Sequence, residues 1–259
     1  MYILLASTLN GDMGLRDSLV QNGHGCDLAQ PFAETAAIAQ HSGPYDMVLL
    51  EVTDIRLQAF AVLREMRRRG VRTPVIAISP EISPEEEKTA LELGADDVMF
   101  RPVHVPVLMA RMQAILRRGL GHASSQLRCG NVVLDQARRT VMVEERPVRI
   151  TCREFDVLEM LMLRPGVLLT KEHFMSRAYG VEEGPDQRIL DVFICKLRRK
   201  LALAGSAEIV RTVWGRGYVL HEPNQADLLA ARERFRAAKP RMRRAHLAMD
   251  NPPSLAIAV

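Results

Sequence analysis

The chain has 259 residues, of which 47% are hydrophobic and 25% charged, so it is long enough for two domains with cores of their own. Its formal net charge of +4 is unevenly spread: residues 1–125 contain 12 Lys and Arg against 15 Asp and Glu, residues 126–221 contain 16 against 12, and residues 222–259 contain 7 against 4. This distribution predicts a polyanionic partner for the second half alone.

Membrane, secreted and metal-binding classes are disfavoured. No apolar run reaches membrane-spanning length, and the run at residues 2–6 has no basic flank before it, which favours a buried strand over a signal peptide. We therefore expect a cytoplasmic protein without a membrane partner. The four cysteines are widely spaced, with no CxxC motif and no nearby histidine, so neither a zinc site nor a disulfide framework is indicated.

Residues 1–118 alternate short apolar runs with helical patterns. The runs lie at residues 2–6, 26–29, 46–51, 74–79 and 96–100. Five such units predict an α/β fold with a doubly wound, five-stranded parallel sheet. One helix start is encoded locally, because Ser83 and Glu86 form a capping-box pattern and Pro84 stands at the first helical position.

Residues 119–126 contain Gly, Ser and His without apolar periodicity, and we expect a linker there. In the second domain, predicted over residues 127–221, strand patterns at 127–134 and 140–150 surround a polar turn. Thr151 and Glu154 form a second capping-box pattern, which opens a helix. The elements expected next are a short strand, a helix and a loop, at residues 167–170, 171–178 and 179–187.

The stretch from 186 to 220 begins with a helix that has two different faces on a 3.6-residue period. The apolar face consists of Leu190, Phe193, Ile194, Leu197 and Leu201. The other face carries Arg188, Val192, Cys195 and Arg199, with Lys196 and Arg198 beside it. A cationic strip backed by a core suits the major groove of DNA, where Val192 is able to touch a thymine methyl.

A hairpin follows this helix. Residues 209–213 and 218–220 read as strands, and the tight turn at Gly215, Arg216 and Gly217 needs glycine's free φ. The result is a wing with Arg216 at its tip. A basic helix alone is most often a surface helix with solvated charges, but the order of helix, basic helix and glycine-rich hairpin favours DNA binding.

This half resembles the α+β winged helix-turn-helix effector domain of the OmpR/PhoB response regulators. The stretches VFICKLRRKL and VWGRGYVL are most similar to the CtrA type of cell-cycle transcription regulators. The resemblance implies that double-stranded DNA is the partner, that Lys196 reads a base edge, that Arg216 reaches the minor groove and that Trp214 packs at the wing base or touches sugar. The implied phosphate contacts are Arg188, Arg198, Arg199 and Thr212. Cys195 interrupts a run that is often basic in the wider family.

The first half, with GADD at residues 94–97 and Pro102 after the last predicted strand, resembles a receiver domain of the two-component systems. A receiver holds Mg²⁺ with two acids after its first strand. Here those positions carry Ser7, Thr8 and Leu9, which lack the oxygen ligands that Mg²⁺ requires. We therefore expect neither a metal nor a cofactor.

The other pocket positions also depart from the receiver pattern. Glu51 stands at the degenerate phospho-acceptor position, Ser79 keeps the hydroxyl after the fourth strand, and Arg101 replaces a lysine. Because phosphoryl transfer depends on positioning and on metal-borne charge, we expect no control by phosphorylation. Two interpretations of Glu51 remain open: a decayed site, or a permanent carboxylate that reaches toward Ser79 or pairs with Arg101 and imitates the phosphorylated state.

Charges around the fifth predicted strand resemble the dimer face of this family. Asp96 and Asp97 precede the strand, and Arg111, Arg117 and Arg118 lie on the last helix of the first half. The resemblance implies a homodimer through the receiver-like domain. The alternative is a set of solvated surface charges, each of little energetic weight.

Two further segments have expected roles. In the resembled family the loop at 179–187 touches RNA polymerase, and Glu182 and Glu183 are the candidates for that contact unless they are simply solvated. Residues 222–259 form a basic tail with a helix that Pro240 stops. We expect the tail to be a mobile basic arm that adds phosphate contacts or stays disordered.

These features predict a sequence-specific, DNA-binding transcription regulator that works independently of phosphorylation. The alternative is a signalling adaptor whose receiver-like half binds kinase or phosphotransfer partners. An enzyme is disfavoured, because the sequence has no nucleophile elbow, metal-ligand cluster or glycine-rich phosphate loop.

Overall fold

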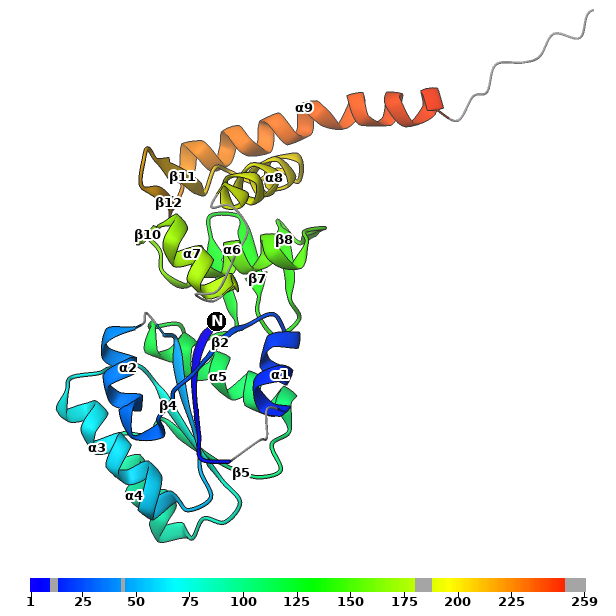
Figure 1. Cartoon of the computed structure of the whole chain (residues 1–259). Coiled ribbons are helices and arrows are strands. Elements are labelled where there is room, and N and C mark those ends of the chain that lie inside the picture. The colour runs from blue at the N-terminus through cyan, green and yellow to red at the C-terminus, as the bar shows by residue number, and fades with distance from the viewer. Residues whose placement is uncertain (10–13, 43–44, 180–187, 250–259) are drawn as a thin grey trace, which may run out of the picture. The chain divides into compact units, whose positions relative to one another are not determined.

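The computed structural model describes residues 1–9, 14–42, 45–179 and 188–249. The chain forms two compact units (Figure 1). The first contains residues 1–125 together with 170–190, and the second contains residues 126–169 together with those from Asp191 onward. Among the described residues, no helix is both long enough and apolar enough to cross a membrane.

A five-stranded parallel sheet forms the centre of the first unit, in the order β2-β1-β3-β4-β5. The strands are β1 (Tyr2–Ser7), β2 (Gly25–Leu28), β3 (Met47–Glu51), β4 (Val75–Ser79) and β5 (Asp97–Phe100). Strands β3 and β4 are buried along their whole length, as expected where helices cover both faces of a parallel sheet. The predicted doubly wound, five-stranded parallel sheet is therefore confirmed.

Helices cover both faces of this sheet (Figure 1). They are α1 (Gly14–Gln21), α2 (Thr35–His41), α3 (Phe60–Arg68), α4 (Pro84–Glu92) and α5 (Val105–Gly119), with short helical turns η1 (Phe32–Glu34) and η2 (Ile55–Ala59). Side chains alternate along β1, so Ile3 and Leu5 pack with Leu108 of α5 in one core, while Leu4 packs with Leu63 of α3 in the other. The two-residue period of the strand thus fills two separate cores.

The parallel strands end at one edge of the sheet, where the candidate pocket lies. Ser7 ends β1, Glu51 ends β3 and Ser79 ends β4. Ser7 and Glu51 are direct partners in the register of β1 and β3. Ligands of such sheets bind outside the carboxyl ends of the strands, so the fold brings these side chains to the expected place.

Both predicted capping boxes are confirmed. Ser83 accepts a hydrogen bond from the Glu86 amide and the Glu86 carboxylate accepts one from the Ser83 amide, with Pro84 in the first turn of α4. Thr151 and Glu154 make the same reciprocal pair at the start of α6 (Cys152–Leu163). Each box satisfies backbone donors that the first helical turn leaves unpaired.

The second unit opens with a four-stranded antiparallel sheet, in the order β6-β7-β8-β9. The strands are β6 (Gln126–Cys129), β7 (Val132–Asp135), β8 (Thr140–Val143) and β9 (Arg146–Val148). Each of the two strand patterns expected from the sequence is thus a hairpin. The chain turns at Gly130, which has a φ of 55°, and at Glu144 and Glu145, whose φ values are 47° and 66°.

A three-stranded antiparallel sheet and two helices follow α6 in the chain. They are β10 (Leu168–Leu169), α7 (Lys171–Tyr179), α8 (Ile189–Leu203), β11 (Val210–Val213) and β12 (Gly217–Leu220). The strand order is β10-β12-β11, so the hairpin of β11 and β12 extends from the sheet. The three strands and α8 confirm the predicted winged-helix fold, although α7 groups with the first unit.

The last helix, α9 (Gln225–Met249), corrects two expectations. It continues through Pro240 instead of ending there. The first part of α9 is packed on the domain, whereas a mobile arm was expected. Ala231 is buried, and the Arg146 guanidinium stacks 4.0 Å from the centre of the Phe235 ring. A charge pair of 2.5 Å joins Arg232 to Glu144. Long-range packing therefore holds a helix that composition alone predicted to be loose. The apolar end at 254–259 lies outside the described residues.

Candidate nucleic-acid interface and receiver pocket

Helix α8 buries one face and exposes the other. Leu190, Ile194, Leu197 and Leu201 are at most 3% exposed, and their spacing of three and four residues forms one stripe against the core. The exposed face carries Val192, Cys195, Lys196 and Arg199. The helix therefore presents a surface with two cations, a thiol and an apolar side chain.

Two hydrogen-bonded contacts hold α8 at either end. The Tyr218 hydroxyl, on β12, donates to Asp191 at 2.8 Å, and Lys200 lies 2.6 Å from the buried carboxylate of Glu154 on α6. Burial, followed by the Asp191 contact, raises the pKa of Tyr218 to about 12, so this phenol remains a donor at neutral pH. Burial by itself raises the pKa of Glu154, but the Lys200 ammonium and the Thr151 amide outweigh it and lower that pKa. These contacts fix the orientation of α8 on the unit.

The wing is a tight hairpin with an exposed tip. Gly215 and Gly217 have φ values of 71° and 141°, which a side chain at Cβ disfavours, and the Arg216 amide donates to the Val213 carbonyl at 2.9 Å. Trp214 is 88% exposed, and Arg216 beside it is exposed as well. A large exposed indole next to a guanidinium is unusual on a surface without a partner.

Arg198 differs from the other cations of α8 because it is bonded within the unit. Its Nε and Nη2 donate to the Val210 carbonyl at 3.0 and 2.8 Å, and Nη2 also donates to Thr212 Oγ1 at 2.9 Å. Its guanidinium lies 5.6 Å from the centre of the Tyr218 ring. Two residues expected to hold phosphates, Arg198 and Thr212, therefore bind each other and join α8 to the wing.

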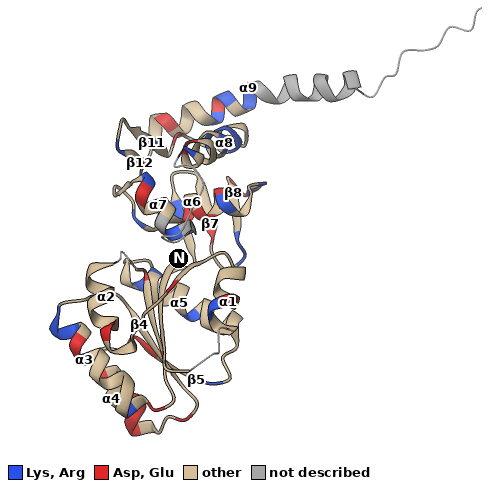
Figure 2. Ribbon diagram, in the orientation of Figure 1, with Lys and Arg blue, Asp and Glu red and all other residues tan. Residues whose placement is uncertain are grey.

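The structure adds one cation that the sequence interpretation missed. Arg211, on β11, is exposed beside Thr212. The sequence predicts a strand at this position, but the apolar residues on either side of Arg211 gave no reason to propose it as a DNA contact. Arg188, immediately before α8, is exposed too. Lys and Arg recur along α8, whereas α4 of the first unit is acidic (Figure 2).

In the first unit, Glu51 is fully buried and has two partners from neighbouring elements. The Ser7 hydroxyl, at the end of β1, donates to Glu51 Oε2 at 2.9 Å. The Arg101 guanidinium, after β5, lies 3.1 Å from Oε1 and is 25% exposed. Glu51 and Arg101 line an open depression of about 610 Å³, together with residues of α1 and with Pro102, Val103 and Val105. The carboxylate, a hydroxyl and a guanidinium are thus brought together at the sheet edge.

The other two predicted pocket residues point to different partners. Ser79 is buried and donates to the Glu81 carbonyl at 3.1 Å, so it does not bind Glu51. Thr8 donates to the Gln58 side-chain oxygen at 3.1 Å. That same oxygen accepts from the amide of Thr53 at 3.1 Å. Gln58 therefore organises the loop after β3 and joins it to Thr8, a role that the sequence interpretation missed because the partners of a loop side chain follow no periodic pattern.

Four of the five charges assigned to a dimer face make contacts within the chain: Asp96, Asp97, Arg111 and Arg118. Arg111 lies 2.8 Å from Asp97, and Asp96 accepts from the Val75 amide at 2.8 Å. Arg118 donates to the Ala114 carbonyl at 3.2 Å. Asp97 and Arg111 thus form a pair across β5 and α5 before any second copy binds. The predicted polymerase contacts Glu182 and Glu183 lie outside the described residues.

Comparison with known proteins gives consistent matches. The family model described as "Transcriptional regulatory protein, C terminal" matches residues 145–220. The cell cycle response regulator CtrA of Brucella anthropi is 44% identical over 181 residues, which are 70% of this chain and 78% of that protein. The CtrA of Brucella abortus strain 2308 is 43% identical with the same coverage. The DNA-binding domain of CpxR from E. coli aligns with 28% identity and a TM-score of 0.34, over 38% of this chain and 96% of that one.

Proposed function

Because this chain belongs to the OmpR/PhoB-type response regulators, DNA-binding transcription regulators with a C-terminal winged-helix domain, we propose that it reads specific DNA sequences without control by phosphorylation. DNA binding through the winged-helix domain follows from the family. The sequence specificity, the state of the receiver pocket and the assembly are the parts that we propose.

The exposed face of α8 supports base reading in the major groove. Lys196 donates to a base edge there, and Val192 contacts a thymine methyl, with Cys195 between them. Arg188 and Arg199 bind phosphates on either side of the groove. Because its nitrogens already bond Val210 and Thr212, Arg198 acts chiefly as a link between α8 and the wing.

The wing supports a second contact. Arg216 at its tip reaches the adjacent minor groove, and Trp214 packs against sugar beside it. Arg211 extends the phosphate contacts along β11. Together the helix and the wing hold the duplex on two sides, which sets the register of the protein on DNA.

The receiver pocket supports independence from phosphorylation. The carboxylate of Glu51 is buried and is held by Ser7 and Arg101, so it is not presented to an incoming phosphoryl group. Ser7 and Thr8 supply neutral hydroxyls where a receiver has acids. Of the two interpretations of Glu51, a fixed charge that imitates phosphorylation is favoured over decay, because a site under no constraint has no reason to keep a buried, paired carboxylate.

The proposed assembly is a homodimer in the cytoplasm, where the DNA lies. It forms through α4, β5 and α5, where Asp97 and Arg111 exchange their contact within one chain for the same contact between two chains. The loop at 179–187 contacts RNA polymerase at promoters. Light scattering over a range of concentrations measures the dimer directly, and an unchanging monomer mass would contradict it.

A genome-wide binding map with the full-length chain tests the proposal as a whole. We expect a recurring motif, tighter binding to it than to shuffled DNA, and a log affinity that falls with log salt by about 0.9 per neutralised phosphate. Maps without a motif, and equal affinity for both DNAs at each salt concentration, would contradict sequence reading. Capture of a kinase or phosphotransfer protein by a chain without DNA affinity would support the adaptor instead.

A further inference from the structure

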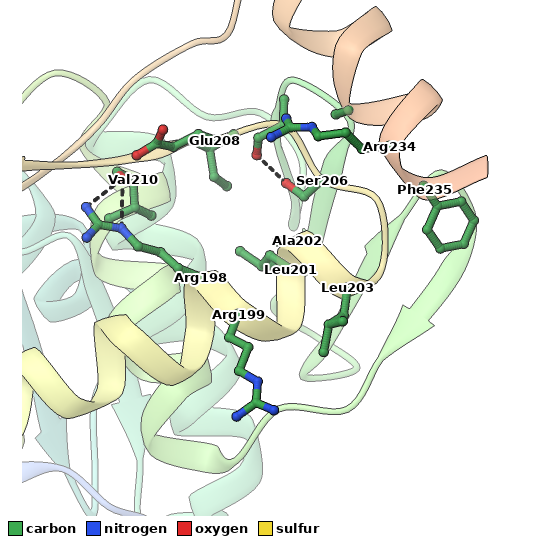
Figure 3. Close-up of a pocket in the computed structure, with 13 residues that line it drawn as sticks. Arg198, Arg199, Leu201, Ala202, Leu203, Ser206, Glu208, Val210, Arg234 and Phe235 are labelled. Carbon is green, nitrogen blue, oxygen red and sulfur yellow. Dashed lines mark hydrogen bonds between the residues drawn. The ribbon is translucent and has the colours of Figure 1, made fainter. Parts of the chain in front are cut away.

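A cavity of about 480 Å³ lies in the second unit where α8, the segment after it and α9 meet (Figure 3). Its size falls within the range of small-molecule sites in proteins, roughly 300 to 1,000 Å³. Helix α9 contributes Ala231, Arg234 and Phe235, so the cavity exists only because this helix packs on the winged-helix domain.

The walls of the cavity are mainly apolar. Leu201, Ile209 and Ala231 are at most 3% exposed and contribute to its lining. Leu203, at the last residue of α8, is 53% exposed and also lines it. Covering this exposed leucine and the apolar recess beside it with an apolar group is favourable, because it removes apolar surface from water.

Polar contacts hold the walls apart. The Asn131 side chain donates to the Gly205 carbonyl at 2.9 Å and accepts from the Ala207 amide at 3.1 Å, which fixes the segment after α8. In the same segment, Arg146 donates to the Ala204 carbonyl at 3.0 Å, and its guanidinium also stacks on Phe235 of α9. These contacts hold the segment after α8 and join it to α9 at one edge of the recess.

The polar part of the lining is predominantly cationic. Arg198, Arg199 and Arg234 line the cavity, with Glu208 as the acid. Figure 3 shows the Arg234 side chain reaching from α9 toward Ser206, whereas Arg199 points away. The Nε of Arg234 donates to the Ala230 carbonyl at 3.3 Å. Its planar, charged end is suited to a carboxylate or sulfonate.

We infer that this cavity binds an amphipathic organic anion, with an apolar body between α8 and α9 and its acid group on Arg234. Occupancy lowers DNA affinity, and this second part rests on the proposed function. The link is Arg198, which lines the cavity and also bonds Val210 and Thr212 of the wing. An occupant whose apolar body packs beside Arg198 displaces its guanidinium from Val210 and Thr212, and this weakens the connection between α8 and the wing.

The test uses two fluorescent probes and the full-length chain. The probes are 8-anilinonaphthalene-1-sulfonate and N-phenyl-1-naphthylamine, which share their rings but differ in the sulfonate. We expect saturable binding of one sulfonate probe per chain, about tenfold tighter than the neutral probe, as a charge-assisted contact provides. Equal affinities, or many weak sites, would overturn the inference.

Matched variants locate the site. Arg234→Gln weakens the sulfonate probe about tenfold and leaves the neutral probe nearly unchanged, whereas Arg236→Gln, also exposed on α9 but outside the lining, changes neither. Leu203→Ser weakens both probes severalfold, and Leu229→Ser, at an exposed leucine outside the lining, has no effect. Equal effects within either pair would place the probe elsewhere and overturn the inference. Melting curves confirm that each variant is folded.

DNA titrations with and without the sulfonate probe test the coupling. We expect a probe concentration that fills the wild-type cavity, but only a small part of the weaker Arg234→Gln cavity, to reduce the DNA affinity of the wild type much more than that of the variant, each compared with its own affinity without probe. Probe binding that leaves DNA affinity unchanged would overturn the coupling. Absence of DNA binding in the probe-free samples would instead contradict the proposed function, while the probe titrations still decide the cavity.

Discussion

The charged groups on the exposed face of α8 and on the wing differ from those of the receiver pocket in where their partners come from. Lys196, Arg199 and Arg216 are exposed, whereas Glu51 is fully buried with Arg101 at 3.1 Å. Exposed cations gain little from contacts within the chain and remain available for an outside anion. A buried carboxylate stays charged only when it is paired or hydrogen-bonded, and here Ser7 and Arg101 of the same chain provide these contacts. The exposed cations of α8 and the wing thus remain open to an anion from outside the chain. In the receiver pocket, the chain supplies both the carboxylate and the guanidinium.

Arg198 lies between these extremes. It stands on α8, the helix proposed to read DNA, yet it is bonded to Val210 and Thr212 as Arg101 is paired with Glu51. A basic residue on a reading helix is therefore not automatically a DNA contact. The comparison predicts that changes in the buried pair alter folding most, and that changes on the exposed face alter DNA binding most.

The largest expected effect is on the buried pair. Glu51→Gln leaves the Arg101 charge beside a neutral amide, and we expect the free energy of unfolding to fall by about 3 kcal/mol. Urea unfolding followed by circular dichroism measures this loss. Glu85→Gln, at an exposed glutamate on α4, is the control and should change stability by less than about 0.5 kcal/mol. Similar unfolding curves for Glu51→Gln and Glu85→Gln would show that the buried pair contributes no more to stability than an exposed glutamate does.

The same position tests whether the fixed charge imitates phosphorylation. We expect Glu51→Gln and Glu51→Asp to weaken occupancy of a DNA with paired half-sites by about 1 to 3 kcal/mol, the usual size of coupling between sites. The first removes the charge, and the second shortens its reach without restoring a metal site. Titrations at fixed salt measure the effect on folded protein. If the DNA titration curves of the wild type and both variants superimpose, the pocket is better interpreted as a decayed site.

On the exposed face, Lys196→Ala should remove discrimination of about 1 to 3 kcal/mol at one base position. Arg188→Ala, its matched control, should weaken binding to all DNAs alike. Competition titrations with single-base variants of the site separate the two profiles. If both substitutions reduce the affinity for specific and random DNA equally, Lys196 contacts only the DNA backbone.

A smaller effect is expected at the link between α8 and the wing. Thr212→Val removes the Oγ1 that accepts from Arg198, and we expect a stability loss of about 0.5 to 1 kcal/mol. Urea unfolding and the salt dependence of DNA affinity are measured together. Unchanged stability with weaker binding to all DNAs alike, and an unchanged salt dependence, would show instead that Thr212 acts mainly as a phosphate contact.

No effect at all is expected from a phosphoryl donor. Incubation with acetyl phosphate and Mg²⁺ should give no gain in mass, because Glu51 is buried in contact with Ser7 and Arg101. Intact-mass spectrometry and intrinsic fluorescence provide the measurement, with a receiver that has its aspartate as the positive control. A stoichiometric, acid-labile adduct would contradict the claim that the buried, paired Glu51 is closed to a phosphoryl group.

The elements of both units were predictable from the sequence because they depend on local patterns. Five apolar runs became the parallel sheet, and the capping boxes at Ser83 and Thr151 form as their spacing indicates. The faces of α8 follow from helical periodicity, so Leu197 is buried and Lys196 exposed. Side-chain periods and hydrogen bonds three residues apart require no knowledge of the rest of the chain.

The partners of individual side chains were decided only by the tertiary structure. Arg198 bonds the strand after its helix, Gln58 gathers the loop after β3, and Ser79 turns to a carbonyl instead of Glu51. Helix α9 was expected to be loose, yet Phe235 meets Arg146 and closes a cavity. These outcomes depend on which groups, near or distant in sequence, arrive within hydrogen-bond or van der Waals distance, and packing decides that, not composition or spacing.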